Sequence, residues 1–149
     1  MFSTLPFQYI LLADDDEDEL LLLGDILKSI GIPHNIFHVL NYDELDRFLH
    51  AELIPTIIFL DINMPGRHGI VCLKEIRQLP VYDNVPVIMY SHARNPEEIE
   101  ACRQAGASLY VSKPSGYLSM EKIFRQIFSM NWPERPWIMD KENFVLNNP

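Results

Sequence analysis

The stretch Ile57-Ile58-Phe59-Leu60-Asp61-Ile62-Asn63-Met64-Pro65-Gly66 decides how this chain folds. Its first four apolar residues predict a buried strand, and the Pro-Gly pair predicts a turn. Asp61 therefore stands at the carboxyl end of a strand, where open α/β sheets place their functional groups. A second apolar run, residues 9–13, ends in the same way, in Asp14-Asp15. Two strand ends that carry carboxylates predict one acidic pocket.

Strand-like and helix-like segments alternate five times, which predicts a parallel sheet with helices on both faces. The expected strands are 8–13, 35–39, 56–60, 87–90 and 108–111. The expected helices are 17–30, 42–50, 68–78, one that begins at Asn95-Pro96, and 119–130. We therefore predict a doubly wound, five-stranded parallel sheet with the strand order 2-1-3-4-5 and five helices.

Length, charge and cysteine content narrow the class of protein. A chain of 149 residues is long enough for one domain with a proper core. The net charge of −9 argues against a nucleic-acid surface, which needs clustered Lys and Arg. The sequence has no apolar run of about 18 residues, so no membrane span is expected. With no signal peptide, Cys72 and Cys102 predict two free thiols in a cytoplasmic protein.

The predicted topology gathers polar side chains at one edge of the sheet. The strand ends there carry Asp14-Asp15, Asp61, Ser91 and Lys113. Neighbouring carboxylates would hold protons unless a cation neutralised them, and Mg²⁺ prefers such oxygen ligands. Asp61 is the best nucleophile toward phosphorus because it stands alone, whereas the Asp14-Asp15 pair suits a metal. The ammonium of Lys113 and the hydroxyl of Ser91 would then stabilise the transferred phosphoryl group.

At these residues the chain resembles the response-regulator receiver family of two-component signalling, a family with a flavodoxin-like fold. The matching motifs are the Asp14-Asp15 pair, the block from Asp61 through Met64-Pro65-Gly66 to Gly69, Ser91, and Tyr110 with Lys113-Pro114. The resemblance covers residues 8–130, so we predict a receiver at 1–130 and an aromatic, proline-containing tail at 131–149 without a separate output domain.

The resemblance implies a role for each acidic residue. Asp61 would accept a phosphoryl group from a sensor histidine kinase or a phosphotransfer protein. Asp15 and Asp61 would bind Mg²⁺ directly, Asp14 partly through water, and Asn63 through its backbone carbonyl. We expect a stand-alone phosphoprotein that signals through a downstream protein target by contact.

The resemblance also implies a switch. Ser91 and Lys113 would contact the phosphoryl group, and Tyr110 would turn inward as Ser91 moves toward it. A cis Lys113–Pro114 bond and a homodimer through the face formed by residues 96–130 are further expectations from the family.

Three other features have simpler interpretations. Residues 16–19 are interpreted as a solvated helix start. His92 is a bulky neighbour of Ser91, either a surface side chain or a partial gate over Asp61. Trp132, Trp137 and Phe144 are expected to fold back on the last helix, or otherwise to form a docking or dimer patch.

Other functions are weighed against the receiver. A Mg²⁺-dependent phosphohydrolase that uses Asp61 would need a second acid two residues later, and Asn63 cannot act as a general acid. A nucleotide-binding module would need a Gly-rich phosphate-binding loop after a strand, and no predicted strand of this sequence is followed by one. A phosphate sink or relay receiver without its own output stays open. We therefore do not expect an enzyme, beyond self-phosphorylation from a donor and self-dephosphorylation.

Overall fold

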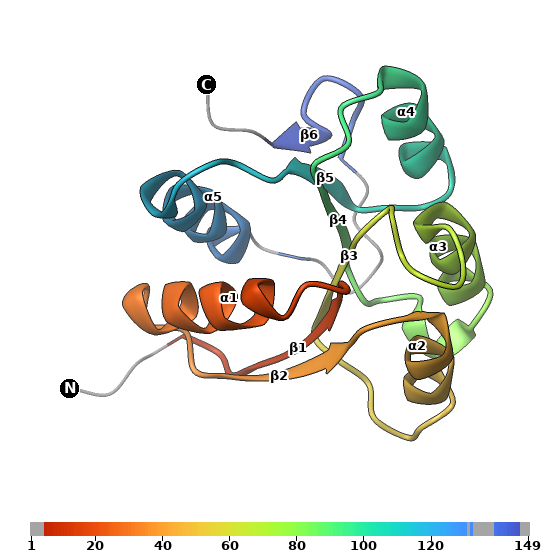
Figure 1. Ribbon diagram of the computed structural model, residues 1–149, viewed down its shortest axis with the longest axis horizontal. Helices are drawn as coiled ribbons and strands as arrows, with labels where there is room; N and C mark the ends of the chain where they lie inside the picture. The colour runs from red at the N-terminus through yellow and green to blue at the C-terminus, as the bar shows by residue number, and fades with distance from the viewer. Residues whose placement is uncertain (1–4, 131, 133–138, 147–149) are drawn as a thin grey trace.

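Six parallel strands form one sheet in the order β2-β1-β3-β4-β5-β6, with helices on both of its faces (Figure 1). The computed structural model describes residues 5–130, 132 and 139–146. The elements in chain order are β1 (Gln8–Ala13), α1 (Glu17–Ser29), β2 (His34–Val39), α2 (Tyr42–Leu49), β3 (Ile57–Leu60), α3 (Gly69–Arg77), a 3₁₀ turn η1 (Pro80–Tyr82), β4 (Val87–Ser91), α4 (Pro96–Gln104), β5 (Leu109–Ser112), α5 (Tyr117–Ser129) and β6 (Val145–Leu146). The predicted order of the first five strands is confirmed.

The sheet is covered on both faces, so its central strand β3 is apolar and buried along its whole length. Successive side chains of a strand point to opposite faces. Leu11 belongs to the core that α2, α3 and α4 cover, whereas Ile10 and Leu12 belong to the core under α1 and α5 (Figure 1). This alternation puts Tyr110 on the first face and Tyr90 on the second.

Side chains that the sequence marks as helix caps do cap the helices. Asn41 Oδ1 accepts a hydrogen bond of 2.9 Å from the Glu44 amide at the start of α2. Asn95 Oδ1 accepts one of 2.8 Å from the Glu97 amide at the start of α4. Each cap satisfies a backbone donor that has no partner within its own helix, so it fixes where the helix begins.

The strand β6 is the main feature that the sequence did not predict. It pairs in parallel with β5, Val145 beside Tyr110. The Tyr110 amide donates to the Phe144 carbonyl at 2.9 Å, and the Phe144 side chain is buried in the α2–α3–α4 core. Part of the tail therefore extends the sheet, although two residues of strand pattern are too short to be recognised in a sequence.

The expectation for the tail aromatics is confirmed only in part. Trp132 follows α5 and folds back onto it, since its Nε1 donates to the Ile127 carbonyl at 3.2 Å. Phe144 instead packs on the opposite face of the sheet from α5, and Trp137 lies outside the described residues. Because β6 covers the edge of β5, a dimer through residues 96–130 would have to include or displace it.

Three further observations concern single expectations. The Lys113–Pro114 bond is trans, so the expectation of a cis bond is wrong. An X–Pro bond favours the trans form by about 0.5–1 kcal/mol, and the local sequence does not reverse this preference. Cys72 and Cys102 are free, as predicted, and both are buried. Among the described helices, none is both long and apolar enough to cross a membrane.

Candidate functional site

The carboxyl ends of β1, β3, β4 and β5 meet at one edge of the sheet, and backbone hydrogen bonds continue the strand pairing to the residues that follow. The Asp14 amide donates to the Val39 carbonyl at 3.1 Å, and the Asp61 amide donates to the Ala13 carbonyl at 3.0 Å. The Lys113 amide donates to the Ser91 carbonyl at 2.9 Å. Each polar side chain of the edge therefore projects from backbone that is held in place.

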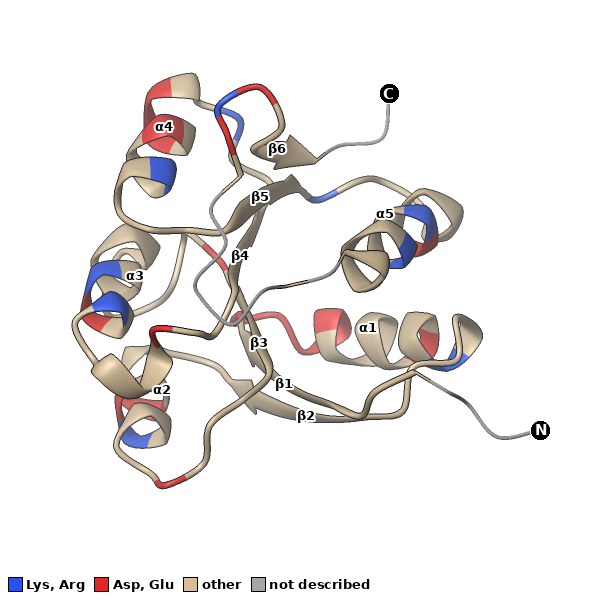
Figure 2. Cartoon of the chain, turned by 180° about the vertical axis from the view of Figure 1, so that it is seen from behind, with Lys and Arg blue, Asp and Glu red and all other residues tan. Residues whose placement is uncertain are grey.

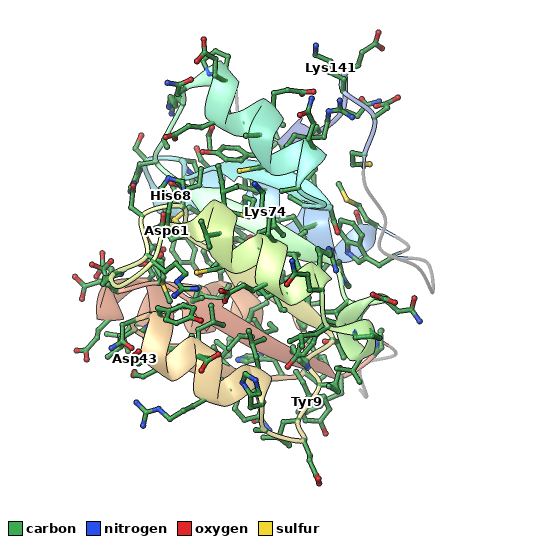
Figure 3. All side chains as sticks on the ribbon, turned by 90° about the vertical axis from the view of Figure 1, so that its right-hand side faces the viewer. Tyr9, Asp43, Asp61, His68, Lys74 and Lys141 are labelled. Atoms are coloured by element: carbon green, nitrogen blue, oxygen red, sulfur yellow. The ribbon has the colours of Figure 1, made fainter. Side chains whose placement is uncertain are left out.

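The figures show the same edge from two sides. In Figure 2, acidic residues follow β1 and fill the first turn of α1. In Figure 3, Asp61 lies close to His68, while Tyr9, near the start of β1, lies at the other side of the molecule. The edge that carries the acidic residues is thus the one at which the strands end.

Gly69 holds the chain after Asp61 close to the sheet. Its amide donates to the Ile62 carbonyl at 2.6 Å. A Cβ atom at this position would lie 2.3 Å from the Asp61 carbonyl oxygen, a distance that backbone atoms cannot tolerate. The end of the Asp61–Gly69 block is therefore glycine because the start of α3 packs directly against the backbone of Asp61.

Lys113 is the centre of the site. Its Nζ lies 2.6 Å from Asp14 Oδ2 and 3.3 Å from Asp61 Oδ2, and all three residues are buried. Burial by itself would lower the pKa of Lys113, but the hydrogen bond to Asp14 and the charge of Asp61 raise it above its ordinary value. The side chain is therefore a fixed ammonium that joins two strand ends.

The three predicted acidic residues lie close enough to share one cation. Carboxylate oxygens of Asp14, Asp15 and Asp61 all lie within 4.8 Å of one another. Asp14 is 1% exposed and Asp61 is 8% exposed, whereas Asp15 is open to solvent. Hard oxygen ligands with open coordination positions suit Mg²⁺, so the residues present fit a divalent ion. Asn63 follows in the same turn, and its backbone amide donates to Asp61 Oδ1 at 3.0 Å.

Ser91 and Tyr110 meet at the loop after β4. The Ala93 amide donates to Ser91 Oγ at 3.2 Å. The Tyr110 hydroxyl donates to the Ala93 carbonyl, so both side chains bond to the same residue. Tyr110 is fully buried, and burial raises its pKa to about 12. The ring therefore points inward as a neutral phenol in this structure.

The interpretation of residues 16–19 as a solvated helix start is wrong for one of them. Asp16 does cap α1, since its side chain accepts from the Asp18 amide at 2.9 Å. Glu19 is instead only 13% exposed at its side chain, with Oε1 3.6 Å from Lys113 Nζ. No local signal in the sequence distinguishes it, because residues 16–19 are all acidic and lie together at the start of α1.

Tyr90 is the second residue that the sequence did not point to. It is 3% exposed, and Lys113 Nζ lies 5.1 Å from the centre of its ring. Because Tyr90 stands within a run of apolar strand residues, the sequence indicates only a residue of the core. His92, by contrast, is exposed, in accord with a surface side chain; a gating role for it stays a prediction.

With this geometry established, known proteins can be compared. Residues 10–125 match the family model of the response regulator receiver domain. This chain belongs to the response regulator receiver family. Receiver domains of this family are phosphorylated by histidine kinases, and the sheet and helices found here are those of the family.

Two relatives show which known proteins this receiver is similar to in sequence. The response regulator Rcp1 of Synechocystis sp. is 26% identical over 135 residues, which cover 87% of this chain and 91% of Rcp1. The sensory/regulatory protein RpfC of Xanthomonas campestris is 33% identical over 107 residues, which cover 70% of this chain but only 14% of RpfC. The chain thus spans about a seventh of the length of RpfC.

The fold of this receiver also matches that of a solved response regulator. The crystal structure of the Mn²⁺-bound form of Rcp1 superposes with a TM-score of 0.75 and 25% identity, covering 85% of this chain and 99% of that one. The receiver is therefore similar to Rcp1 along nearly the whole of that protein.

Proposed function

We propose that this receiver accepts a phosphoryl group on Asp61, in a Mg²⁺-dependent reaction, and signals through phosphorylation-dependent contact with another protein. The observation that carries the proposal is the position of the buried Lys113 ammonium, which lies against both Asp14 and Asp61, with Asp15 beside them. A sensor histidine kinase or a phosphotransfer protein is the proposed donor, and the predicted cytoplasmic location belongs to the same proposal.

The proposed chemistry is a displacement at phosphorus. An oxygen of the Asp61 carboxylate attacks the phosphorus of a phosphohistidine, the new P–O bond forms as the P–N bond breaks, and the leaving imidazole nitrogen takes the electron pair. Lys113 lies within reach of Asp61, so its ammonium can bind an oxygen of the transferred group. The imidazole leaves as a neutral ring when its other nitrogen already carries a proton, so the step needs no general acid from this chain, and Asn63 supplies none.

The metal requirement rests on the charge of the site. Asp14, Asp15, Asp61 and the carbonyl of Asn63 are the proposed ligands of Mg²⁺, which when bound would draw negative charge from the phosphoryl oxygens. Rcp1, to which this receiver is similar, has been crystallised with Mn²⁺, which supports a divalent ion here.

The proposed readout uses Ser91 and Tyr110. Their hydrogen bonds meet on Ala93, so movement of the Ser91 hydroxyl toward a phosphoryl group would release the loop that the Tyr110 hydroxyl also holds. A change of this kind at the β4–α4 loop would alter the surface formed by residues 96–130, where we place the partner contact.

Intact mass measurement tests the proposal. We expect wild-type protein to gain one phosphoryl mass when incubated with acetyl phosphate and Mg²⁺, and to gain none with EDTA. The matched variant Asp61→Asn removes the nucleophile and keeps the size of the side chain, so it should gain no mass. Fast repeated release of phosphate by the wild type would instead indicate a phosphohydrolase. No mass gain, together with no NMR change on adding beryllofluoride, would contradict phosphoacceptor function.

A further inference from the structure

Lys113 has neighbours that neither metal binding nor phosphoryl transfer requires. Glu19 Oε1 lies 3.6 Å from Lys113 Nζ, and the ammonium also lies 5.1 Å from the centre of the Tyr90 ring. Glu19 lies in the first turn of α1, and Tyr90 is the next-to-last residue of β4. The ammonium is therefore shared by the carboxylates of Asp14, Asp61 and Glu19, with a phenol ring beside it.

The hydroxyl of Tyr90 is buried and has no hydrogen-bond partner among the described residues. Its ring is fixed by edge-on packing against Phe59 and Phe124, with centroid distances of 6.1 and 5.6 Å. Burial raises the pKa of Tyr90, and Glu19 is the carboxylate that adds most to this, both by its charge and by its closeness to the hydroxyl. A buried hydroxyl without a partner is unfavourable, so a state of the protein in which it finds one is stabilised.

We propose that Glu19 and Tyr90 are positioning residues that set how readily Lys113 leaves its resting place for the phosphoryl group. In the unphosphorylated receiver, Glu19 helps to hold the ammonium. When the ammonium moves to a phosphoryl group on Asp61, the Tyr90 hydroxyl donates to the Glu19 carboxylate that it has left. This inference rests on the proposed phosphorylation of Asp61.

The two side chains should act in opposite directions. The Glu19 carboxylate attracts Lys113 in the resting state and repels a bound phosphoryl dianion, so it disfavours the phosphorylated state. The Tyr90 hydroxyl lies near Glu19 but makes no hydrogen bond of good geometry in the resting state. It can complete one once Lys113 has moved, so it favours that state. The hydroxyl acts through Glu19, and its effect should therefore depend on the Glu19 carboxylate.

Beryllofluoride binding, followed by two-dimensional NMR at saturating Mg²⁺, measures this balance. We expect Glu19→Gln to tighten apparent beryllofluoride binding by about threefold to tenfold. Tyr90→Phe should weaken it by about threefold, the effect of one hydrogen bond. In the Glu19→Gln background, Tyr90→Phe should change binding by less than about twofold. The steady-state phosphorylated fraction with acetyl phosphate should move in the same directions.

Glu17→Gln is the matched control. It removes the same charge from the same helical turn, but Glu17 is exposed, so its effect is screened and should stay below about twofold. Thermal melts of each variant show whether the fold is kept.

The outcomes separate the two proposals. A wild type that gains no phosphoryl mass and binds no beryllofluoride contradicts the proposed function. A wild type that does both, with Glu19→Gln no different from Glu17→Gln, overturns the role of Glu19. Equal effects of Tyr90→Phe with and without Glu19 would show that Tyr90 acts through packing alone, which also overturns the inference.

Discussion

Replacing Lys113 by methionine tests the electrostatics of the site most directly. The substitution keeps a long apolar stem and removes the ammonium that lies 2.6 Å from Asp14 and 3.3 Å from Asp61. Two buried carboxylates would then face each other without a counter-charge. We predict that Lys113→Met lowers the free energy of unfolding by about 3–5 kcal/mol at neutral pH in EDTA, as expected when one partner of a buried ion pair is removed.

The magnitude follows from the distances. With an effective dielectric constant of about 20, Coulomb's law gives a gross attraction of about 6 kcal/mol for the pair with Asp14 and about 5 kcal/mol for the pair with Asp61. Removing three charged groups from water offsets much of this attraction. The net contribution of the lysine is therefore far smaller than the gross value, whereas the two carboxylates that remain are both buried and repel each other.

Urea unfolding with and without Mg²⁺ measures the effect. A divalent ion bound by the same carboxylates replaces the lost positive charge, so saturating Mg²⁺ should stabilise Lys113→Met by more than it stabilises the wild type. Lys122→Met is the control, because Lys122 is exposed on α5 and its removal should change stability by less than about 0.5 kcal/mol.

Two results would refute this reasoning. A loss below about 1 kcal/mol in EDTA would show that the carboxylates do not depend on the ammonium. Equal stabilisation of both proteins by Mg²⁺ would show that the metal does not bind where Lys113 neutralises the site.

Three further predictions concern other parts of the structure. Gly69→Ala should destabilise the protein by about 1–3 kcal/mol and greatly slow phosphorylation by acetyl phosphate, because its Cβ would lie 2.3 Å from the Asp61 carbonyl oxygen. Burial raises the pKa of Cys102 from 9.0 to about 12, so its contribution to stability is complete below pH 9 and is lost as the pH rises through about 9 to 12. The free energy of unfolding measured with urea should therefore fall by about 1.4 kcal/mol for this thiol between about pH 8 and about pH 10. Phe144→Ala should cost about 2–4 kcal/mol if β6 unfolds with the domain, and should speed hydrogen exchange of the Tyr110 amide, which donates to Phe144.

Each of these predictions has its own control. Gly24→Ala lies inside α1, where nothing is within 4 Å of the added Cβ, so it should leave phosphorylation unchanged. Cys102→Ala should lose less stability than the wild type over the same rise in pH, and an equal loss would assign the effect to other groups. An unchanged exchange rate at Tyr110 in Phe144→Ala would show that β6 does not protect β5.

Much of the fold and of the candidate site could be predicted from the sequence, because both follow from local patterns. Apolar runs that end in Asp14, Asp61 and Lys113 specify strands with polar ends, and the rules of parallel sheets bring those ends together. Caps such as Asn41 and Asn95 act within a few residues of their own position, so helix starts can be read directly.

The tertiary structure decided what depends on contacts between distant segments. Glu19 and its neighbours are equally acidic in the sequence, and only the docking of α1 on the sheet turns Glu19 toward Lys113. Tyr90 becomes part of the site because of the same packing. Phe144 and β6 join the sheet through β5, a pairing that no local pattern specifies. The sequence by itself determined which groups stand at the strand ends; the packing of helices and tail around them determined which neighbours surround the buried ammonium, because side-chain contacts across elements are set by three-dimensional position and not by spacing along the chain.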